Sequence, residues 1–208
     1  MKLLVATRSD GKAREARRLL TLAGVEAVFP DELGLLESPA EALLELGESF
    51  AANARAKAEY FVRRSGLPTV ADDSGLEVLS LGGAPGVRSK RFAIVPEEVT
   101  GVPLDAANNA ELLRRLEGAP APKRRARFRC VLAYCPSPSA PPELIDESCA
   151  GVILDAPKGD SGFGYDPLFL SDDLGKTFAE ATPGEKDEVS HRGRAFRALA
   201  QRLAALHH

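Results

Sequence analysis

Two adjacent carboxylates, Asp72 and Asp73, stand at the end of an apolar run and directly before Ser74-Gly75. Neighbouring strand residues point to opposite faces of a sheet, so these two side chains are expected to do different work. We assign Asp73, beside a predicted turn, to a cleft, and Asp72 to support of the local backbone or of a neighbouring functional group. The competing interpretation is that Asp-Ser-Gly is ordinary turn chemistry without a functional role.

A polar loop, Thr7 to Lys12, lies between the first predicted strand and the first predicted helix. The start of a helix presents unpaired N–H groups and the positive end of its dipole, which suits a phosphate group. Lys12 adds a mobile cation, and Thr7 and Ser9 add hydroxyl groups. The loop is not a Walker A motif, because the second glycine and the Lys-Ser/Thr pair are missing. A plain strand-to-helix connection with an exposed lysine is the alternative.

The segment Gly159–Pro167 contains three glycines and two aromatic residues within nine positions. Glycine lets a backbone approach a ligand closely. Phe163, placed between two glycines, could stand exposed and stack on a planar ring. A tight turn that tucks Phe163 into the core explains the same residues.

Ser190-His191-Arg192-Gly193 opens the last predicted helix, with Ser190 as a candidate N-cap. His191 and Arg192 then project from a helix N-terminus, where cations oppose the helix dipole. Local conflict of this kind tends to mark a functional site, and here it hints at a ligand that carries acceptor atoms.

The hydrophobic pattern around these stretches predicts an α/β chain. Strands are expected at Lys2–Ala6, Val25–Phe29, Leu76–Leu81, Arg124–Tyr134, Leu144–Leu154 and Leu168–Leu170. Helices are expected at Ala13–Ala23, at Leu104–Leu116, from a cap at Ser49 to about Arg64, and from Ser190 to Leu206. The first strand, loop and helix make half of a βαβ unit, and the two long strands suggest an extension of its sheet.

The chain has 208 residues, enough for one large domain or two small lobes. A net charge of −3 argues against a general nucleic-acid binder, but it leaves room for a phosphorylated small molecule in a local basic pocket. No apolar run approaches membrane-spanning length, and the N-terminal apolar run is too short for a signal peptide. Scarce Asn, Gln and Met fit a thermophile and a GC-rich genome equally well.

The chain has three cysteines, Cys130, Cys135 and Cys149, without the spacing of a metal site. We therefore expect reduced, mostly buried thiols in a cytoplasmic protein.

Several motifs occur in an order that resembles one known family. They are Ala6-Thr7-x-x-x-Gly11-Lys12, Ser49-Phe50-x-x-Asn53-Ala54-x-x-Lys57-Ala58, Ala71-Asp72-Asp73-Ser74-Gly75-Leu76, Leu81-Gly82-Gly83-Ala84-Pro85-Gly86-Val87, Gly162-Phe163-Gly164-Tyr165-Asp166-Pro167-Leu168-Phe169, Phe178-Ala179-Glu180, and Lys186 with Ser190-His191-Arg192-Gly193. The ordered set spans nearly the whole chain. It resembles the nonstandard purine NTP pyrophosphatases, also called inosine/xanthosine triphosphate pyrophosphatases or the HAM1-like family.

The resemblance implies a single α/β domain over residues 1–208, with a long central mixed sheet and two lobes around a nucleotide-binding cleft. It also implies a homodimer and Mg²⁺-dependent cleavage of ITP, dITP and XTP to the monophosphate and pyrophosphate. The resemblance implies that Asp73 is the catalytic carboxylate and that Glu45 and Asp73 are the metal ligands. The residues implied on the triphosphate are Thr7, Arg8, Ser9, Asp10, Gly11 and Lys12, with Lys57 and Ser74 beside them. The residues implied around the nucleoside are Phe163, Gly164, Tyr165, Asp166, Lys186, His191 and Arg192.

Two kinds of chemistry suit these residues. Mg²⁺ prefers carboxylate and phosphate oxygens, which Glu45, Asp73 and a triphosphate supply. Hypoxanthine and xanthine carry a keto oxygen at position 6, and donors such as His191 and Arg192 favour it over the amino group of adenine. Guanine carries the same keto group, so these donors do not explain its rejection.

Two positions depart from the family pattern: Ser9 stands where Asn is common, and Ala52 where Glu is common. Three alternatives therefore stay open at this point. They are a Maf-like nucleotide pyrophosphatase of different base specificity, an inactive purine nucleotide-binding module, and a structural Rossmann-like protein without purine preference.

Overall fold

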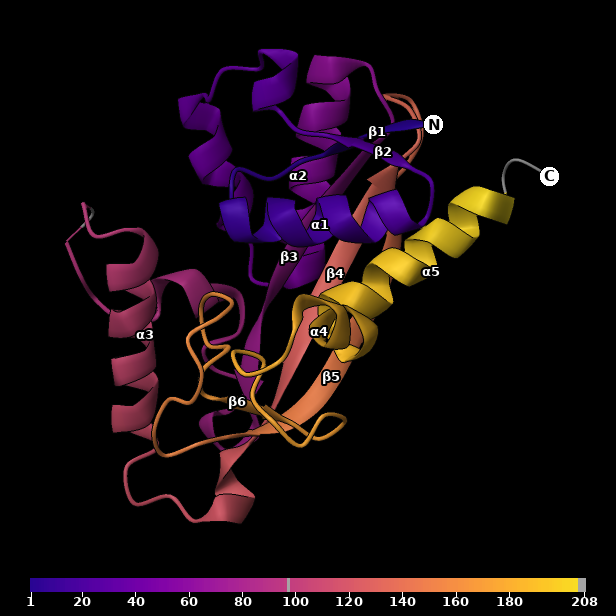
Figure 1. Ribbon diagram of the computed structural model, residues 1–208. Coiled ribbons are helices and arrows are strands. Elements are labelled where there is room, and N and C mark those ends of the chain that lie inside the picture. Colours follow the sequence, from indigo (N-terminus) through magenta and orange to yellow (C-terminus); the bar gives the residue numbers. More distant parts are fainter. Residues whose placement is uncertain (97, 206–208) are drawn as a thin grey trace. The chain divides into compact units, whose positions relative to one another are not determined.

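Six strands form one mixed sheet in the computed structural model, which describes residues 1–96 and 98–205 (Figure 1). The strand order is β2-β1-β3-β4-β5-β6. The strands are β1 (Lys2–Val5), β2 (Glu26–Val28), β3 (Thr69–Val78), β4 (Arg125–Cys135), β5 (Glu143–Ile153) and β6 (Phe169–Ser171). β1 pairs in parallel with β2 and β3, whereas β5 and β6 are antiparallel. The predicted α/β class with a mixed sheet is confirmed.

Five α-helices and five short 3₁₀ segments connect the strands in the part of the chain that is described. The helices are α1 (Asp10–Leu22), α2 (Phe50–Ser65), α3 (Gly101–Arg115), α4 (Pro183–Val189) and α5 (His191–Ala205). The 3₁₀ segments are η1 (Asp31–Leu33), η2 (Pro39–Glu45), η3 (Leu79–Leu81), η4 (Gly86–Arg91) and η5 (Ala121–Arg124). The expectation that the last helix reaches Leu206 concerns a position outside the described residues. Within that part, no helix has the length and apolarity needed to cross a membrane.

The chain divides into two compact units. Unit 1 comprises Met1–Asp73, Cys130–Glu147 and Arg192–His208, and unit 2 comprises Ser74–Arg129 and Ser148–His191. The backbone therefore passes from one unit to the other directly after Asp73 and directly after His191.

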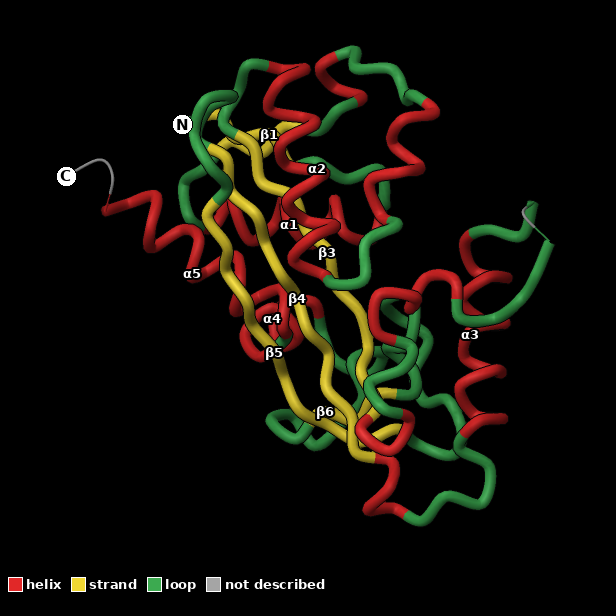
Figure 2. Tube along the Cα trace, turned by 180° about the vertical axis from the view of Figure 1, so that it is seen from behind, coloured by secondary structure: helices red, strands yellow, loops and turns green. Residues whose placement is uncertain are grey.

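Unit 1 is built on β1, β2 and the adjoining parts of β3, β4 and β5. α1 and α5 cover one face of this sheet and α2 covers the other, as the front and back views show (Figures 1 and 2). The apolar residues of α1 recur at helical spacing, so that they form one face. That face packs against α5 and the sheet in a core that includes Leu3, Val5, Leu19, Leu20, Val70, Phe196 and Leu199.

α2 has clear boundary signals at both ends. The Ser49 Oγ accepts a hydrogen bond from the Ala52 N–H at 3.2 Å, and Gly66 ends the helix with φ +70°. The buried face of α2 contains two polar residues, Asn53 and Lys57, among apolar ones. Polar groups are rarely buried without partners, so this face marks a functional region.

Unit 2 has its own core, centred on three aromatic rings. The Phe128 ring lies 4.7 Å from that of Phe169 and 5.9 Å from that of Phe178, centroid to centroid. Buried Arg124 stands at the edge of this core, where its guanidinium donates to the carbonyl oxygens of Leu116, Ile153 and Leu154. These bonds satisfy carbonyl groups at the end of α3 and of β5 that would otherwise lack partners.

The turn predicted at Ser74-Gly75 is wrong, because β3 continues through both residues to Val78. Glycine is needed at 75 for another reason: a Cβ there would lie 2.6 Å from the carbonyl oxygen of Gly86. Small polar residues suggested a turn, but here they allow η4 to approach the strand closely. The strand expected over Leu76–Leu81 likewise ends at Val78 and is followed by η3.

Two further boundaries differ from expectation. α1 begins at Asp10 rather than Ala13, so that Asp10, Gly11 and Lys12 belong to its first turn. The segment before the last predicted helix, where no helix is predicted, contains α4, which begins with a capping box between Thr182 and Glu185. This short helix places Lys186 in a fixed position, whereas a loop would have left it mobile.

The capping box makes a testable contribution to stability. Hydrogen bonds from Lys176 and from the Thr182 backbone N–H lower the pKa of Glu185 from 4.5 to about 2. A carboxyl whose folded pKa is depressed stabilises the fold above its unfolded pKa, and this effect disappears as the pH falls through the folded value. We expect Glu185→Gln to lower the free energy of unfolding at pH 6, and the difference from wild type to shrink between pH 4.5 and pH 2. Urea unfolding followed by circular dichroism measures this, and a difference independent of pH would contradict it.

Candidate active site

Asp72 and Asp73 lie in the part of β3 that belongs to unit 1, and their side chains make different contacts. Asp72 accepts hydrogen bonds from Lys12 Nζ at 2.9 Å and Arg192 Nε at 2.6 Å. Asp73 accepts one from Asn53 Nδ2 at 2.8 Å. The first set of partners comes from α1 and α5, and the second comes from α2, which covers the other face. The two side chains therefore lie on opposite faces of β3 and have different partners, as the alternation of strand residues predicts.

Asp72 is the centre of a buried chain of alternating charges, which we call the Asp72 network. It consists of Lys12, Asp72, Arg192 and Glu15, and Arg192 Nη1 donates to the Glu15 carboxylate. Burial alone would raise the pKa of Asp72, but the attraction of Arg192 and Lys12 outweighs it and holds that pKa well below 3.8. Burial would lower the pKa of Arg192, yet Asp72 and Glu15 raise it. Asp72, Lys12 and Arg192 are therefore charged near neutral pH.

Asn53 connects Asp73 to the segment that precedes α2. Its Nδ2 donates to Asp73, while its Oδ1 accepts from the Gly47 N–H at 2.8 Å. A Cβ at position 47 would lie 2.6 Å from that Oδ1, so the contact requires glycine there. Gly47 is two residues after Glu45, so one buried amide fixes Asp73 and the segment that carries Glu45.

Lys57, one turn after Asn53, contacts both β3 and Glu45 in the segment before α2. Its Nζ donates to Glu45 Oε1 at 2.8 Å and to the Asp72 carbonyl oxygen at 2.6 Å, and lies 3.8 Å from Asp73 Oδ1. Burial, followed by the repulsion of Glu45, raises the pKa of Asp73, although Lys57, Lys12 and the Asn53 hydrogen bond act in the opposite direction. Glu45 and Asp73 are thus two carboxylates that share one cation.

The donor set fits a hard divalent cation such as Mg²⁺. The carboxylates of Glu45 and Asp73 converge on one point, the ammonium group of Lys57. No group of three or more His, Cys, Asp or Glu side chains suited to a metal is found among residues 1–96 and 98–205. Magnesium sites commonly use one or two carboxylates and take their other oxygens from phosphate and water, so two suffice.

The loop before α1 leaves donors at the helix N-terminus. Ser9 is the N-cap, with extended backbone, but its hydroxyl makes no capping hydrogen bond. Thr7 Oγ1 accepts from the Ser9 N–H at 3.2 Å, which tightens the turn. Asp10 is exposed and Gly11 is half-buried within the first helical turn. An N-terminus with this arrangement can accept the oxygens of an anionic group.

Arg8, predicted to bind the triphosphate, has its guanidinium engaged elsewhere. Its Nε and Nη2 each donate to the Glu41 carboxylate at 3.0 Å, Nη2 also donates to the Leu35 carbonyl oxygen, and Nη1 pairs with Asp31. The hydrogen bond to Glu41 is the main cause of its raised pKa. Arg8 therefore fastens η1 and η2 to the loop, a role that its position beside Thr7 and Ser9 concealed.

In unit 2, Asp166 and Lys186 form a buried ion pair with an N–O distance of 2.6 Å. The Asp166 Oδ2 also accepts from the Phe163 N–H at 3.0 Å, and the Lys186 ammonium lies 5.1 Å from the Phe163 ring centroid. The Phe163 ring is half-buried, between the two placements considered from sequence. Three of the residues predicted to surround a nucleoside are thus brought together.

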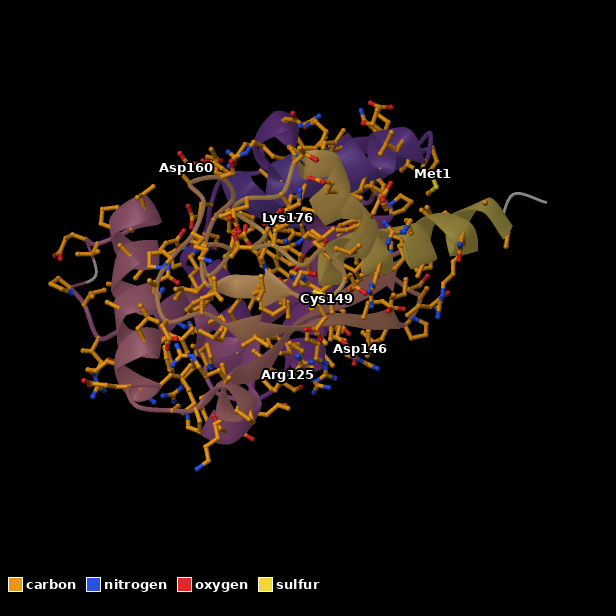
Figure 3. The ribbon with its side chains drawn as sticks, turned by 60° about the horizontal axis from the view of Figure 1, so that its bottom comes forward. Met1, Arg125, Asp146, Cys149, Asp160 and Lys176 are labelled. Atoms are coloured by element: carbon orange, nitrogen blue, oxygen red, sulfur yellow. The ribbon has the colours of Figure 1, made fainter. Side chains whose placement is uncertain are left out.

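Other predicted residues of unit 2 have structural contacts. Tyr165 is buried, and its hydroxyl donates to the Ser89 carbonyl oxygen at 2.8 Å. The His191 ring is buried and stacks on Phe128, with centroids 4.8 Å apart, and its Nδ1 lies 4.0 Å from the sulfur of Cys149, which Figure 3 labels on β5. Ser74 is half-buried in β3.

Sequence reasoning assigned no role to two residues of unit 1 that the structure places at the site. Asn53 had a usable signal, since it lies four residues before Lys57 on one helix face. Glu15 had none, because a glutamate in an Arg-rich helix reads as a surface charge. Its partner Arg192, predicted to contact the base, gives its Nε and Nη1 donors to Asp72 and Glu15.

Unit 1 begins with a parallel β-α-β arrangement, and the N-terminus of α1 lies beside Ser9. Lys12 and Lys57 lie next to the carboxylates of Asp72 and Glu45. These features define an α/β protein suited to anionic ligands. Comparison with known proteins is more specific. The chain belongs to the Ham1 family, whose model matches residues 3–202.

Relatives cover almost the full length of the chain. A dITP/XTP pyrophosphatase of Geobacillus kaustophilus is 44% identical over 199 residues, which are 95% of this chain and 92% of the relative. The solved structure of a HAM1 protein from Coxiella burnetii has a TM-score of 0.83 at 33% identity and covers 99% of both chains. A nucleoside-triphosphatase / dITP/XTP pyrophosphatase from Mycobacterium abscessus has a TM-score of 0.71 at 42% identity, over 96% of this chain and 98% of that one.

The Asp72 network predicts a large asymmetry between buried and exposed charges. Asp72→Asn leaves the buried Arg192 and the half-buried Lys12 against Glu15 alone, and removing one partner of a buried pair typically costs about 3–5 kcal/mol. Asp31→Asn removes an exposed partner of Arg8 and is expected to cost less than about 1 kcal/mol. Urea unfolding at pH 7 compares the two variants, and equal effects would show that the network does not stabilise the fold.

Proposed function

We propose that this chain is a nucleoside triphosphate pyrophosphatase that hydrolyses the non-standard purine nucleotides dITP, ITP and XTP to the monophosphate and pyrophosphate. Membership of the Ham1 family and relatives named dITP/XTP pyrophosphatases support this. The single observation that carries the mechanism is the placement of Asp73. A buried carboxylate, held by an amide and faced by a lysine, lies next to a second carboxylate.

Asp73 is the group that orients the attacking water and takes its proton. Burial raises its pKa, which makes the carboxylate a better proton acceptor than an exposed aspartate. Asn53 fixes the Asp73 Oδ2, so that the Oδ1 facing Lys57 is the oxygen available for this work. A fixed base reduces the entropy lost in reaching the transition state.

Lys12 and Lys57 stabilise the negative charge that develops on the leaving pyrophosphate. Each is held by Asp72, Lys12 through the carboxylate and Lys57 through the backbone carbonyl oxygen. Positioned cations of this kind stabilise a transition state because they need no reorganisation during the reaction. Asp72 is therefore a positioning residue for both.

Glu45 and Asp73 are the residues that would hold Mg²⁺. When bound, the ion neutralises phosphate charge and lowers the pKa of a water molecule. Lys57 lies between the same two carboxylates.

Phosphate oxygens are the proposed ligands of the loop Thr7–Lys12. The Ser9 hydroxyl has no capping bond to give up, and the N-terminal N–H groups of α1 lie beside it. Thr7, Asp10 and Gly11 shape this turn. Arg8 contributes by holding η1 and η2 in place instead of binding phosphate directly.

Unit 2 supplies the nucleoside contacts. Phe163 offers a ring face, and the Asp166–Lys186 pair fixes the backbone beside it. His191 can donate a hydrogen bond to the keto oxygen at position 6, which adenine lacks. Contact of Arg192 with the base stays a prediction, since its role within unit 1 is to hold Asp72.

We also propose, on the family resemblance, that the protein is a homodimer and that it is cytoplasmic. Light scattering would then give a solution mass of twice 22.1 kDa.

The product assay tests this function. With Mg²⁺, we expect pyrophosphate, and no orthophosphate as first product, from ITP and XTP but not from ATP or GTP. Asp73→Asn should nearly stop the reaction, and EDTA should abolish it. Asn53→Leu, which removes the donor to Asp73, should lower kcat roughly 10- to 100-fold, as is typical for residues that orient a reacting group. Orthophosphate as the first product, preference for dTTP or UTP, or binding of ITP without turnover would each rule the proposal out.

A further inference from the structure

Helix α3 of unit 2 binds both backbone polar groups of one residue, Gly164, in the glycine-rich loop. Asp105 Oδ2 accepts from the Gly164 N–H at 2.7 Å, and Asn109 Nδ2 donates to the Gly164 carbonyl oxygen at 3.0 Å. Asp105 and Asn109 are four residues apart, so they lie on one face of the helix. The ribbon view shows α3 beside this loop, whose outer edge carries Asp160 (Figures 1 and 3).

The Gly164 N–H and one of the two acceptor positions of its carbonyl oxygen are used by these hydrogen bonds. Gly164 has φ +64°, a left-handed conformation that side-chain-bearing residues rarely adopt. No atom lies within 4 Å of a Cβ built there, so glycine is needed for its backbone conformation and not for space. Gly164 therefore attaches the loop to α3, and its neighbours in the loop are the residues placed to contact a ligand.

The neighbours of Gly164 are the residues that face the nucleoside in the proposed function. Phe163 precedes it, and the Phe163 N–H is bound to Asp166, which pairs with Lys186. The Asp166 N–H in turn donates to the Phe163 carbonyl oxygen at 3.3 Å. A shift of Gly164 would move the Phe163 ring and loosen the Asp166–Lys186 pair together.

The side chain of Asn109 uses only one of its two polar ends. Its Oδ1 is buried and has no hydrogen-bond partner in the described part of the chain. Leaving a buried acceptor unpaired is costly. The adjacent Asn108, in contrast, uses its Oδ1 on the N–H groups of Phe92 and Ala93 and its Nδ2 on the Lys90 carbonyl oxygen. Local rule-breaking of this kind tends to occur where function requires it.

We propose that Asp105 and Asn109 are positioning residues for base selection: they hold Gly164 so that Phe163 and the Asp166–Lys186 pair present a fixed surface to the purine. The inference rests on the proposed function. It assigns a role in substrate selectivity to α3, which the family motifs do not include. Neither residue touches substrate, so their effect should fall on KM and on selectivity and leave kcat nearly unchanged.

The test uses the full chain with ITP, ATP and GTP as substrates. Asp105→Ala and Asn109→Leu should each raise the KM for ITP about tenfold, which is the scale of one or two lost hydrogen bonds. They should lower the preference for ITP over ATP by a similar factor, with kcat within about twofold of wild type. Asp105→Asn keeps an acceptor for the Gly164 N–H and should restore near-normal values. Because both side chains hold one residue, Gly164, the double variant should show less than the sum of the two effects.

Controls separate this role from general stability. Asn109→Leu also removes the unpaired buried oxygen, so its melting temperature should change little while selectivity falls. Glu111→Gln on the same helix breaks only exposed pairs with Arg114 and Arg115 and should alter neither property. Lower melting temperatures with unchanged KM and selectivity would overturn the inference and leave the proposed function standing. A wild type without Asp73-dependent pyrophosphate release would overturn both.

Discussion

The buried charge of Asp72 is the constraint on which unit 1 depends. A carboxylate taken out of water must be matched by cations at hydrogen-bonding distance, because its desolvation is otherwise prohibitive. Lys12 from α1 and Arg192 from α5 supply that match, and Glu15 balances Arg192. Two helices far apart in the chain are thereby fixed to one strand by charge, in addition to the apolar core that they share.

Because successive side chains of β3 point to opposite faces of the sheet, Asp72 and Asp73 contact different helices. Asp72 points to the side of α1 and α5 and holds Lys12 and Arg192, while Asp73, one residue later, points to the side of α2 and is the carboxylate that we propose for catalysis. On its own face, α2 supplies an amide and an ammonium one turn apart, and each reaches both β3 and the segment before the helix. Asp73 is thus held by the neutral amide of Asn53 at 2.8 Å, and its ion pair with Lys57 is longer, at 3.8 Å.

The motifs identified the family, the class of fold and most of the residues that gather in each unit, because each motif keeps its residue types in order. Sequence failed where the meaning of a residue depended on distant partners. Ser74-Gly75 has the composition of a turn, but the close approach of η4 explains the glycine within a continuous strand. Arg8 and Arg192 stand beside predicted ligand residues, yet acidic partners 33 and 120 positions away engage them. No local pattern reports such pairings.

The contact between Gly47 and Asn53 has a consequence for how this protein can vary. The amide oxygen of Asn53 occupies the place that a side chain at position 47 would need, so substitutions at positions 47 and 53 are coupled. A methyl group at 47 becomes acceptable only if the residue at 53 shrinks, and shrinking it releases the carboxylate of Asp73. Evolution and protein engineering alike must therefore alter the pair together or leave both as they are.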